Sequence, residues 1–348
     1  MRVNRVTAAE VAKLAGVSQP TVSRVFMPGS KVSEDKQKRV REAAIKLGYR
    51  PNTLARSLNT GRSRTIGIVL AYLKNPFYTE ALEKLSAGFH EHGYHIMTFF
   101  ASNLTEEVDG VVEDLLAHQV DGIILASVSM SSELTSRLRD YGIPLVLFNR
   151  GQDDPSIASV TSANFDGGRL AAKYLLAGGH KRIAHIAGWL KSLNGRERKA
   201  GFLAEMKAQG MEPFKIVDCE YSRVIAHQAT LELFRDGSGP DAIFVGNDHM
   251  AFAVLETLKQ ELGLDVPEDV SVVGYDDVAM AAWKTFDLTT LRQPANRMAE
   301  ITVQMLLSMI ENQEPSPRRI EIESPLIERG SAKKPDNWPR DLLQTLDG

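Results

Sequence analysis

The sequence predicts an all-α helix-turn-helix headpiece followed by an α/β domain made of two doubly wound parallel-sheet subdomains. Three observations lead to this prediction. Two short capped helices surround a Gly-Val turn near the N-terminus, positive charge is concentrated in the first 64 residues, and short apolar runs alternate with amphipathic stretches beyond them. A chain of 348 residues has room for two or three domains.

The first predicted helix begins at Thr7. Thr7 and Glu10 have the spacing of a capping box, in which each residue's side chain bonds the other's backbone N–H. Val11, Leu14 and Ala15 then fall on one apolar face. The pattern indicates a short helix with one side buried.

The second predicted helix follows a turn at Gly16, the left-handed residue expected to end the first helix. Ser18 is expected to cap it, and Pro20 fits its first turn because that N–H would be unbonded anyway. Gln19, Pro20 and Arg24 are the expected exposed start. This geometry is typical of a helix placed in a DNA groove.

A third helix is expected between Ser33 and Gly48. Glu34 and Asp35 stand in its first turn, where the helix dipole favours acidic side chains. Its expected buried face consists of Val40, Ala43, Ala44 and Leu47. These three helices complete a predicted headpiece of residues 1–50.

Charge separates this headpiece from the rest of the chain. Residues 1–64 contain fourteen lysines and arginines against four acidic residues, a net charge of +10. The whole chain has 41 basic and 44 acidic residues, which leaves 27 and 40 for residues 65–348, a net charge of −13. A basic head favours a module that faces phosphate groups. A small helical bundle without a DNA role is the alternative.

The segment 7–26 resembles the lactose-repressor and galactose-repressor family of bacterial transcription regulators. The likeness continues through Gly48-Tyr49-Arg50-Pro51-Asn52 and Ala55-Arg56-Ser57-Leu58, which is similar to the family's hinge pattern, where a short helix from each protomer enters the minor groove. So short a helix is unstable alone in water, so residues 52–59 are expected to order only when two copies pair against DNA. Leu58 is the expected apolar wedge that bends the duplex. A plain linker is the alternative for residues 51–64.

The resemblance implies a homodimer that binds double-stranded, pseudo-palindromic operator DNA. Gln19 and Arg24 are expected to contact base edges, whereas Pro20 offers only apolar contact and Thr21 and Ser23 hold phosphates. The expected DNA-binding residues are Thr7, Ser18, Gln19, Pro20, Thr21, Ser23, Arg24, Asn52, Ala55, Arg56 and Leu58.

Beyond residue 64, apolar runs and amphipathic stretches alternate as in a parallel sheet covered by helices on both faces. The expected strands are 65–70, 95–100, 122–126 and 145–148 in one subdomain and 183–187, 216–220, 242–245 and 270–274 in the other. The expected helices are 77–92, 105–118, 131–141, 167–177, 197–209, 223–235 and 248–262.

The family resemblance reaches about residue 330. Its signatures are Asn75-Pro76-Phe77-Tyr78, Gly178-Gly179-His180, Val245-Gly246-Asn247-Asp248 and Val273-Gly274-Tyr275-Asp276-Asp277. It implies a two-lobed effector-binding and dimerisation domain at 65–330, with a fold like that of periplasmic sugar-binding proteins and a tail at 331–348. The chain is expected to cross between lobes near Ala163, Arg292 and Ser324.

Ligands of open α/β sheets bind outside the carboxyl ends of the strands. Asn247 and Asp276 follow predicted strands and therefore stand in that position. Asp276 can accept from two adjacent hydroxyl groups, and Asn247 offers both a donor and an acceptor. The alternative for Asp276 is a structural turn.

The resemblance implies further effector-binding residues. Arg198 lies where the family places an arginine that donates a bidentate pair to effector oxygens, with a surface salt bridge as the alternative. Phe77 and Tyr78 follow the first strand, and Tyr221 matches an aromatic residue that packs on the effector ring; core packing is the alternative for each. Asp166 is a further family-matched polar candidate.

The chain departs from the family at two positions. Many relatives carry an acid where this chain has Ala163, so the hydroxyl which that acid would bind is absent or held differently. Ser192 stands where purine-binding relatives carry a second arginine, which disfavours a nucleobase. The expected small-molecule effector is therefore a sugar, a polyol or a sugar acid, acting as inducer or corepressor.

Several other functions lack their residues. The chain contains no Gly-x-Gly-x-x-Gly after a strand, no phosphate-binding Gly-Lys-Ser/Thr loop and no Gly-x-Ser-x-Gly elbow, so an enzyme and a nucleotide cofactor are not expected. His90, His92 and His95 lack zinc-site partners at recognised spacing, so no metal is expected. A single cysteine, Cys219, and the absence of a signal peptide or apolar span favour a cytoplasmic protein without a membrane contact.

Two other function classes remain as alternatives. One is a cytoplasmic sugar-binding sensor whose headpiece contacts protein, and the other is a sugar-metabolising enzyme on the same scaffold. A steep loss of DNA affinity with salt distinguishes the regulator from the sensor, because only phosphate contacts release counterions.

Overall fold

The computed structural model describes residues 6–26, 31–50, 61–71, 73–101, 105–128, 131–152, 154, 156–311, 319–336 and 338–339. The chain divides into two compact units, Met1–Ser63 and Arg64–Gly348.

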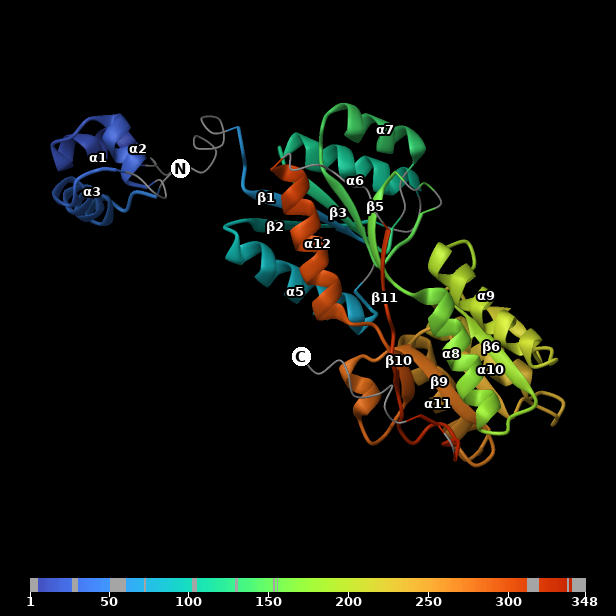
Figure 1. The fold of residues 1–348 in the computed structure, drawn as a ribbon. Helices are drawn as coiled ribbons and strands as arrows, with labels where there is room; N and C mark the ends of the chain where they lie inside the picture. The colour runs from blue at the N-terminus through green and yellow to red at the C-terminus, as the bar shows by residue number, and fades with distance from the viewer. Residues whose placement is uncertain are drawn as a thin grey trace. The chain divides into compact units, whose positions relative to one another are not determined.

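The first unit is a headpiece whose described helices are α1 (Ala8–Ala15), α2 (Gln19–Val25) and α3 (Glu34–Leu47) (Figure 1). Thr7 and Glu10 form the predicted capping box, with the Thr7 backbone N–H donating to Glu10 Oε2 over 2.7 Å. Gly16 ends α1 with a left-handed φ of 63°, and Gly48 ends α3 with a φ of 68°. Its core consists of Val11, Ala12, Ala15, Val22, Val25, Val40, Ala43 and Ala44.

Two local expectations in the headpiece were wrong. The Leu14 side chain is 47 % exposed and lies outside the apolar face that Val11 and Ala15 bury. Ser18 occupies the N-cap position of α2 but makes no side-chain capping bond. Its Oγ lies instead 2.9 Å from Thr21 Oγ1, so the two hydroxyl groups bond each other.

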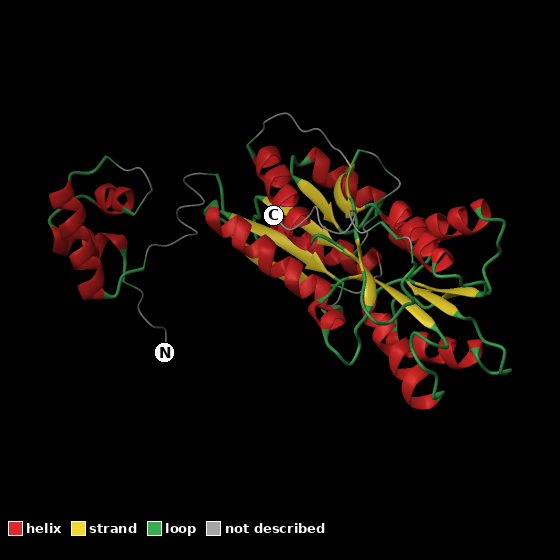
Figure 2. Ribbon diagram, turned by 60° about the horizontal axis from the view of Figure 1, so that its bottom comes forward, coloured by secondary structure: helices red, strands yellow, loops and turns green. Residues whose placement is uncertain are grey.

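The second unit has two lobes, each built on a six-stranded sheet, with helices on both faces (Figures 1 and 2). The sheet of the first lobe, here called the N-lobe, is parallel throughout and has the order β11-β5-β4-β3-β1-β2. Its strands are β1 (Thr65–Leu70), β2 (His95–Phe100), β3 (Gly122–Ala126), β4 (Leu145–Phe148), β5 (Ala158–Ser162) and β11 (Arg319–Ile322).

Two pairs of helices cover the N-lobe sheet. Helices α5 (Pro76–Glu91) and α12 (Ala295–Ile310) lie side by side on one face, and α6 (Thr105–Ala117) and α7 (Ser132–Asp140) cover the other (Figure 1). Apolar side chains of β1, β3 and β4 fill the space on both sides of the sheet. This burial on both faces explains why those strands are near-continuous apolar runs.

The C-lobe sheet has the order β12-β10-β9-β8-β6-β7 and is parallel except for β12, which runs antiparallel to β10. Its strands are β6 (Ile183–Ala187), β7 (Ile216–Asp218), β8 (Ala242–Val245), β9 (Ser271–Asp276), β10 (Thr289–Arg292) and β12 (Leu326–Ile327). Its helical elements are α8 (Asn164–Ala177), α9 (Leu193–Ala208), α10 (Arg223–Leu233), α11 (Asp248–Glu256), the π-helical η1 (Thr257–Glu261) and the 3₁₀-helical η2 (Ala279–Ala282).

The chain passes between the two sheets three times. It leaves the N-lobe sheet after β5, returns after β10 to form α12 and β11, and enters the C-lobe sheet again at β12. The carboxyl ends of β5, β10 and β11 therefore lie together where the lobes meet (Figure 1).

The predicted fold class is confirmed, including the two parallel-sheet subdomains. Some bounds differ: β7 ends at Asp218 rather than 220, and the helix expected over 248–262 changes from α11 to the π-helical η1 at Thr257. The elements that the sequence analysis did not identify are β5, β10, β11, β12 and α12.

Candidate functional site

A polar cavity lies between the two lobes. It is lined by Asn75, Tyr78, Ser127, Asn149, Arg150, Asn194, Arg198, Tyr221, Asn247, Asp276 and Gln293. Ser127, Asn149 and Gln293 directly follow a strand, Asp276 ends one, and Arg150 and Asn247 come two residues after one. The parallel topology therefore gathers them at one place, as expected for a ligand site of an open α/β sheet.

Asp276 is the carboxylate of the cavity. Its Oδ1 accepts from Gln293 Nε2 over 2.6 Å and its Oδ2 accepts from Asn75 Nδ2 over 2.8 Å. Burial raises the pKa of Asp276 to about 6, although the Arg198 guanidinium and these two hydrogen bonds oppose the rise. Its backbone φ of 133° is unusual for a residue with a side chain, and such strain is typical of ligand sites.

Arg198 is buried beside Asp276 and held rigidly. Its Nε donates to Asn164 Oδ1 over 2.8 Å, and its Nη1 donates to the Gly246 carbonyl oxygen over 2.6 Å. The guanidinium carbon lies 3.5 Å from the centroid of the Tyr275 ring. The side chain thus has a fixed direction, and the alternative of a surface salt bridge is wrong.

Asn247 serves both the fold and the cavity. Its Oδ1 accepts from the Met250 backbone N–H over 3.0 Å and so caps α11. This cap leaves the amide nitrogen as the donor that the side chain can offer to a ligand.

Tyr78 and Tyr221 bring aromatic surface to the cavity from opposite lobes. The Tyr78 hydroxyl accepts from Asn149 Nδ2 over 3.2 Å, and burial raises the pKa of Tyr78 to about 12. Tyr221 has a left-handed φ of 57° at the turn after β7. Its ring packs on Gly188 of the same lobe, where a Cβ would come within 2.1 Å of Tyr221 Cε1. Each side chain thus has a contact within its own lobe.

Several contacts hold the two lobes together around the cavity. Asn194 of α9 donates through Nδ2 to the Asn149 carbonyl oxygen over 3.0 Å, and its Oδ1 accepts from the Gly151 backbone N–H over 3.3 Å. The Arg150 guanidinium carbon lies 5.1 Å from the centroid of the Trp189 ring. Each contact joins a residue that follows β4 to one that follows β6, so the cleft is closed.

Two expected effector residues do not reach the cavity. Phe77 is 2 % exposed and stacks on Phe148, with ring centroids 6.3 Å apart, so it belongs to the N-lobe core. Asp166 lies exposed in the first turn of α8. The two glycines that follow it serve packing, because a Cβ at Gly168 would collide with the Arg198 carbonyl oxygen and one at Gly167 would come within 2.6 Å of the Tyr275 hydroxyl.

Ser192 also lies outside the lining of the cavity. Its Oγ accepts from the Gly195 backbone N–H over 3.1 Å and donates to the Trp189 carbonyl oxygen over 2.6 Å. The residue therefore caps α9, and its short side chain has a structural role of its own.

Sequence reasoning missed several lining residues. Ser127 and Asn149 directly follow predicted strands, so the rule that identified Asn247 and Asp276 would have found them. Gln293 follows β10, which the sequence analysis had not identified. Asn194 lies inside a helix, where no local signal marks it.

The exposed face of α2 presents the residues expected to contact DNA. Gln19, Pro20, Ser23 and Arg24 are exposed and Thr21 is half-buried. Thr7 is exposed at the start of α1, with its hydroxyl bonded to Glu10. The remaining expected DNA contacts, which lie outside the described residues, are Asn52, Ala55, Arg56 and Leu58.

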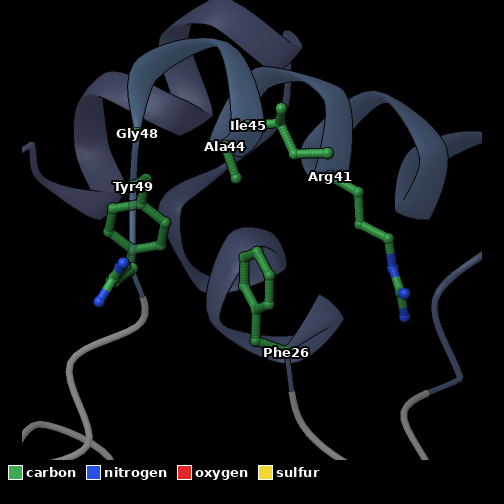
Figure 3. Close-up of a pocket in the computed structure, with 7 residues that line it drawn as sticks. Phe26, Arg41, Ala44, Ile45, Gly48 and Tyr49 are labelled. Carbon is green, nitrogen blue, oxygen red and sulfur yellow. The ribbon is translucent and has the colours of Figure 1, made fainter.

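The headpiece also has an open hollow next to α3 (Figure 3). The Phe26 and Tyr49 rings lie there with their centroids 6.0 Å apart, and Ile45 is 82 % exposed. The arginines that line it are Arg41 and Arg50. This hollow is a surface feature of the headpiece and shares no residue with the cavity between the lobes.

Two further findings concern other kinds of site. Within the part of the chain that the structure describes, no three histidine, cysteine or acidic side chains are grouped to hold a metal ion. None of the described helices has the length and apolar character needed to cross a membrane.

Comparisons with known proteins match both units. Residues 7–52 match the family described as bacterial regulatory proteins, lacI family, and residues 172–332 match the periplasmic binding protein-like domain. The chain is 31 % identical over 334 residues to the HTH-type transcriptional repressor PurR of Aliivibrio salmonicida, covering 94 % of this chain and 99 % of that protein. It is 33 % identical over 331 residues to the ribose operon repressor of Escherichia coli K12, with the same coverage.

Solved structures give the same likeness over most of the chain. The lac repressor dimer bound to operator and the anti-inducer ONPF has a TM-score of 0.86 at 28 % identity, covering 94 % of this chain and 99 % of that one. The complex of the transcriptional regulator CelR with cellobiose has a TM-score of 0.71 at 31 % identity, covering 94 % and 100 %.

Proposed function

Because this chain belongs to the lacI family of bacterial regulatory proteins and is a transcriptional repressor with an effector-binding, periplasmic-binding-protein-like domain, we propose that its effector is a neutral monosaccharide or a similar polyol. The effector binds between the lobes without being converted. The residues assigned to contact it are Tyr78, Arg198, Tyr221, Asn247 and Asp276, together with Asn75, Asn149 and Gln293.

The observation that carries this proposal is the number of carboxamide side chains in the cavity. The five that line it are Asn75, Asn149, Asn194, Asn247 and Gln293. A carboxamide both donates and accepts hydrogen bonds, and so does a hydroxyl group. Asn194 is used in bonds to the N-lobe, but the other four keep N–H groups or lone pairs beyond their bonds within the protein. A ring that carries several hydroxyl groups can exchange hydrogen bonds with these, whereas an apolar ligand offers them no partner.

The charged pair in the cavity also supports a neutral polyol. Asp276 and Arg198 lie close enough to influence each other's charge, and each is buried. Two adjacent hydroxyl groups can donate to the carboxylate, while oxygens of the same ring accept from the guanidinium. The tyrosines can pack against the C–H face of the ring. The relatives include both PurR and a ribose operon repressor, so the argument depends on this chain's own side chains.

For the DNA side, we assign base contacts to Gln19 and Arg24 and phosphate contacts to Thr21 and Ser23. The assignment is supported by the exposure of Gln19, Ser23 and Arg24 on α2, where Thr21 is half-buried. The lac repressor structure contains a dimer on operator DNA, and we assign a homodimer to this chain as well. Effector binding then changes operator affinity through the lobes, and such coupling is typically about 1–3 kcal/mol.

Calorimetric titration of the full chain tests the effector class. The probes are D-ribose, D-xylose and D-galactose as neutral sugars, D-gluconate as a sugar acid and hypoxanthine as a nucleobase. We expect one neutral sugar to bind, and Asp276→Ala to weaken it by at least about tenfold, since a lost charged hydrogen bond is worth about 1.5–3 kcal/mol. Asp166→Ala is the matched control, because that carboxylate is exposed on α8 and should leave affinity unchanged.

Two results would contradict the proposal. One is binding of hypoxanthine with no binding of any neutral sugar. The other is sugar binding that Asp276→Ala leaves intact, which would place the ligand elsewhere.

A further inference from the structure

The three crossings between the lobes are bonded to one another through the backbone. The Ala163 N–H, on the first crossing, donates to the Ile322 carbonyl oxygen on the third over 2.8 Å. The Arg292 N–H, on the second, donates to the Pro325 carbonyl oxygen on the third over 2.8 Å. These two amides therefore report on whether the crossings stay together.

A tyrosine side chain joins the same crossings. Tyr275, near the end of β9, is fully buried, and its hydroxyl oxygen lies 3.3 Å from Ser162 Oγ and 3.1 Å from Ser324 Oγ. Ser162 ends β5 on the first crossing and Ser324 lies on the third. Ser162 Oγ in turn lies 2.9 Å from Oε1 of Gln293 on the second crossing.

These four side chains are connected by hydrogen bonds. Ser162 donates to Gln293 Oε1, because a carboxamide oxygen can only accept. The Tyr275 hydroxyl donates toward Ser324 Oγ over 3.1 Å and toward Ser162 Oγ over 3.3 Å, so its one proton is shared between the two serines. The result is a chain of hydrogen bonds that connects Ser324, Tyr275, Ser162 and Gln293. Such chains strengthen each member by polarisation.

The chain ends at the cavity. Gln293 Nε2 donates to Asp276 Oδ1 over 2.6 Å, and the Tyr275 ring supports the Arg198 guanidinium. Tyr275 itself does not line the cavity. It is therefore placed to act through Gln293 and Arg198 rather than by touching a ligand.

We infer that Tyr275 is a positioning residue which, through Ser162, Ser324 and Gln293, makes the three crossings move as one unit and links that movement to the side chains that bind the effector. This inference rests on the proposed function for the meaning of the cavity. This hydrogen-bonded chain explains how a ligand held by Asp276 can influence all three crossings, although the ligand contacts only the second, through Gln293.

Hydrogen exchange of the full-length chain tests the inference without any ligand, so its result does not depend on the proposed sugar. The Gln293 N–H is a third reporter, because it donates to the Asp276 carbonyl oxygen over 3.0 Å. We expect Tyr275→Phe and Ser324→Ala each to accelerate exchange of the Ala163, Arg292 and Gln293 amides together, by about tenfold, because a local opening would then release all three. Ser324→Ala is the stricter variant. Within the described residues, the Ser324 side chain is hydrogen-bonded to Tyr275, and its effect on the first and second crossings must therefore pass through Tyr275.

Tyr174→Phe is the matched control. Tyr174 is also fully buried in the C-lobe, and its hydroxyl donates to Glu328 Oε1 over 3.0 Å, away from Tyr275's partners. Its removal should leave the three amides within about twofold of the original rates. The inference is overturned if the control accelerates them equally, if Ser324→Ala accelerates Arg292 alone, or if neither variant changes them.

Discussion

Asn75 of the N-lobe donates a 2.8 Å hydrogen bond to Asp276 of the C-lobe, while its own Oδ1 accepts from the Phe77 backbone N–H over 3.0 Å. One carboxamide thus caps α5 and closes the cleft. The start of α5 and the carboxylate of the cavity are tied together, although 201 residues separate them in the sequence. A ligand that takes the place of Asn75 on Asp276 therefore acts directly on α5.

The double role of Asn75 predicts that Asn75→Ala lowers the free energy of unfolding by more than the loss of a helix cap alone. Losing the cap costs about 1 kcal/mol. Leaving Oδ2 of the buried Asp276 carboxylate without its donor costs about 1–3 kcal/mol more. Urea unfolding measures the sum. Ser131→Ala is the control, because Ser131 Oγ caps α7 in the same lobe by accepting from the Leu134 N–H over 3.0 Å. Equal losses of free energy in the two variants would show that the bond across the cleft adds nothing.

The buried Asp248 predicts that stability falls as pH rises. Burial, with the nearby Asp276 charge as the second cause, raises the pKa of Asp248 to about 8, whereas in an unfolded chain an aspartate titrates at about 3.9. Between these values the folded state keeps a proton that the unfolded state has lost. The free energy of unfolding therefore decreases with rising pH, by at most about 1.4 kcal/mol per pH unit for this group.

Urea unfolding at pH 6, 7 and 8 measures this slope. Asp276, whose pKa is raised to about 6, contributes mainly below this range. Asp248→Asn should flatten the curve, because an amide does not titrate in this range. The amide can still accept from the Val278 N–H and bond Thr290 Oγ1, the two partners that the carboxyl has now. A variant curve that runs parallel to the original would refute the assignment.

The sequence predicts those parts of the fold that depend on local pattern. β3 (Gly122–Ala126) is buried on both faces, so its sequence is an apolar run that no helix periodicity disturbs. β11 (Arg319–Ile322) lies at the sheet edge and alternates charged with apolar residues, which is a weak signal in so short a segment. α12 (Ala295–Ile310) has an amphipathic pattern, but no helix was predicted in that region.

The site shows the same division. Asn247 and Asp276 could be predicted because a polar residue directly after an apolar strand lies at the carboxyl edge of the sheet. Asp166 also follows a strand on the chain, but the chain has already left that sheet and started α8, so its side chain turns to solvent. The contact of Tyr275 with Ser324 depends on three crossings meeting in space, and no local pattern encodes that.

Arg198→Lys is predicted to be a damaging substitution despite the retained charge. The guanidinium donates to Asn164 and Gly246 and lies over the Tyr275 ring, and a lysine ammonium cannot do all three at once. We expect the affinity for the bound sugar to fall by at least about tenfold, or 1.4 kcal/mol. Arg169→Lys is the control, because Arg169 is exposed and pairs with Glu205 over 3.3 Å. Sugar affinity unchanged in Arg198→Lys would show that charge alone matters there.

Arg24→Ala is predicted to change which sequences the repressor prefers, not only how tightly it binds. Arg24 is exposed in the last turn of α2, where an arginine can donate two hydrogen bonds to a guanine edge. The loss should be about 1–3 kcal/mol and should relax selection at one base pair. Selection of binding sites from a random duplex library measures both effects. Lys38→Ala is the control: Lys38 is exposed on α3, and its loss should weaken all duplexes alike or none. An unaltered site preference in Arg24→Ala would mean that this arginine holds phosphate.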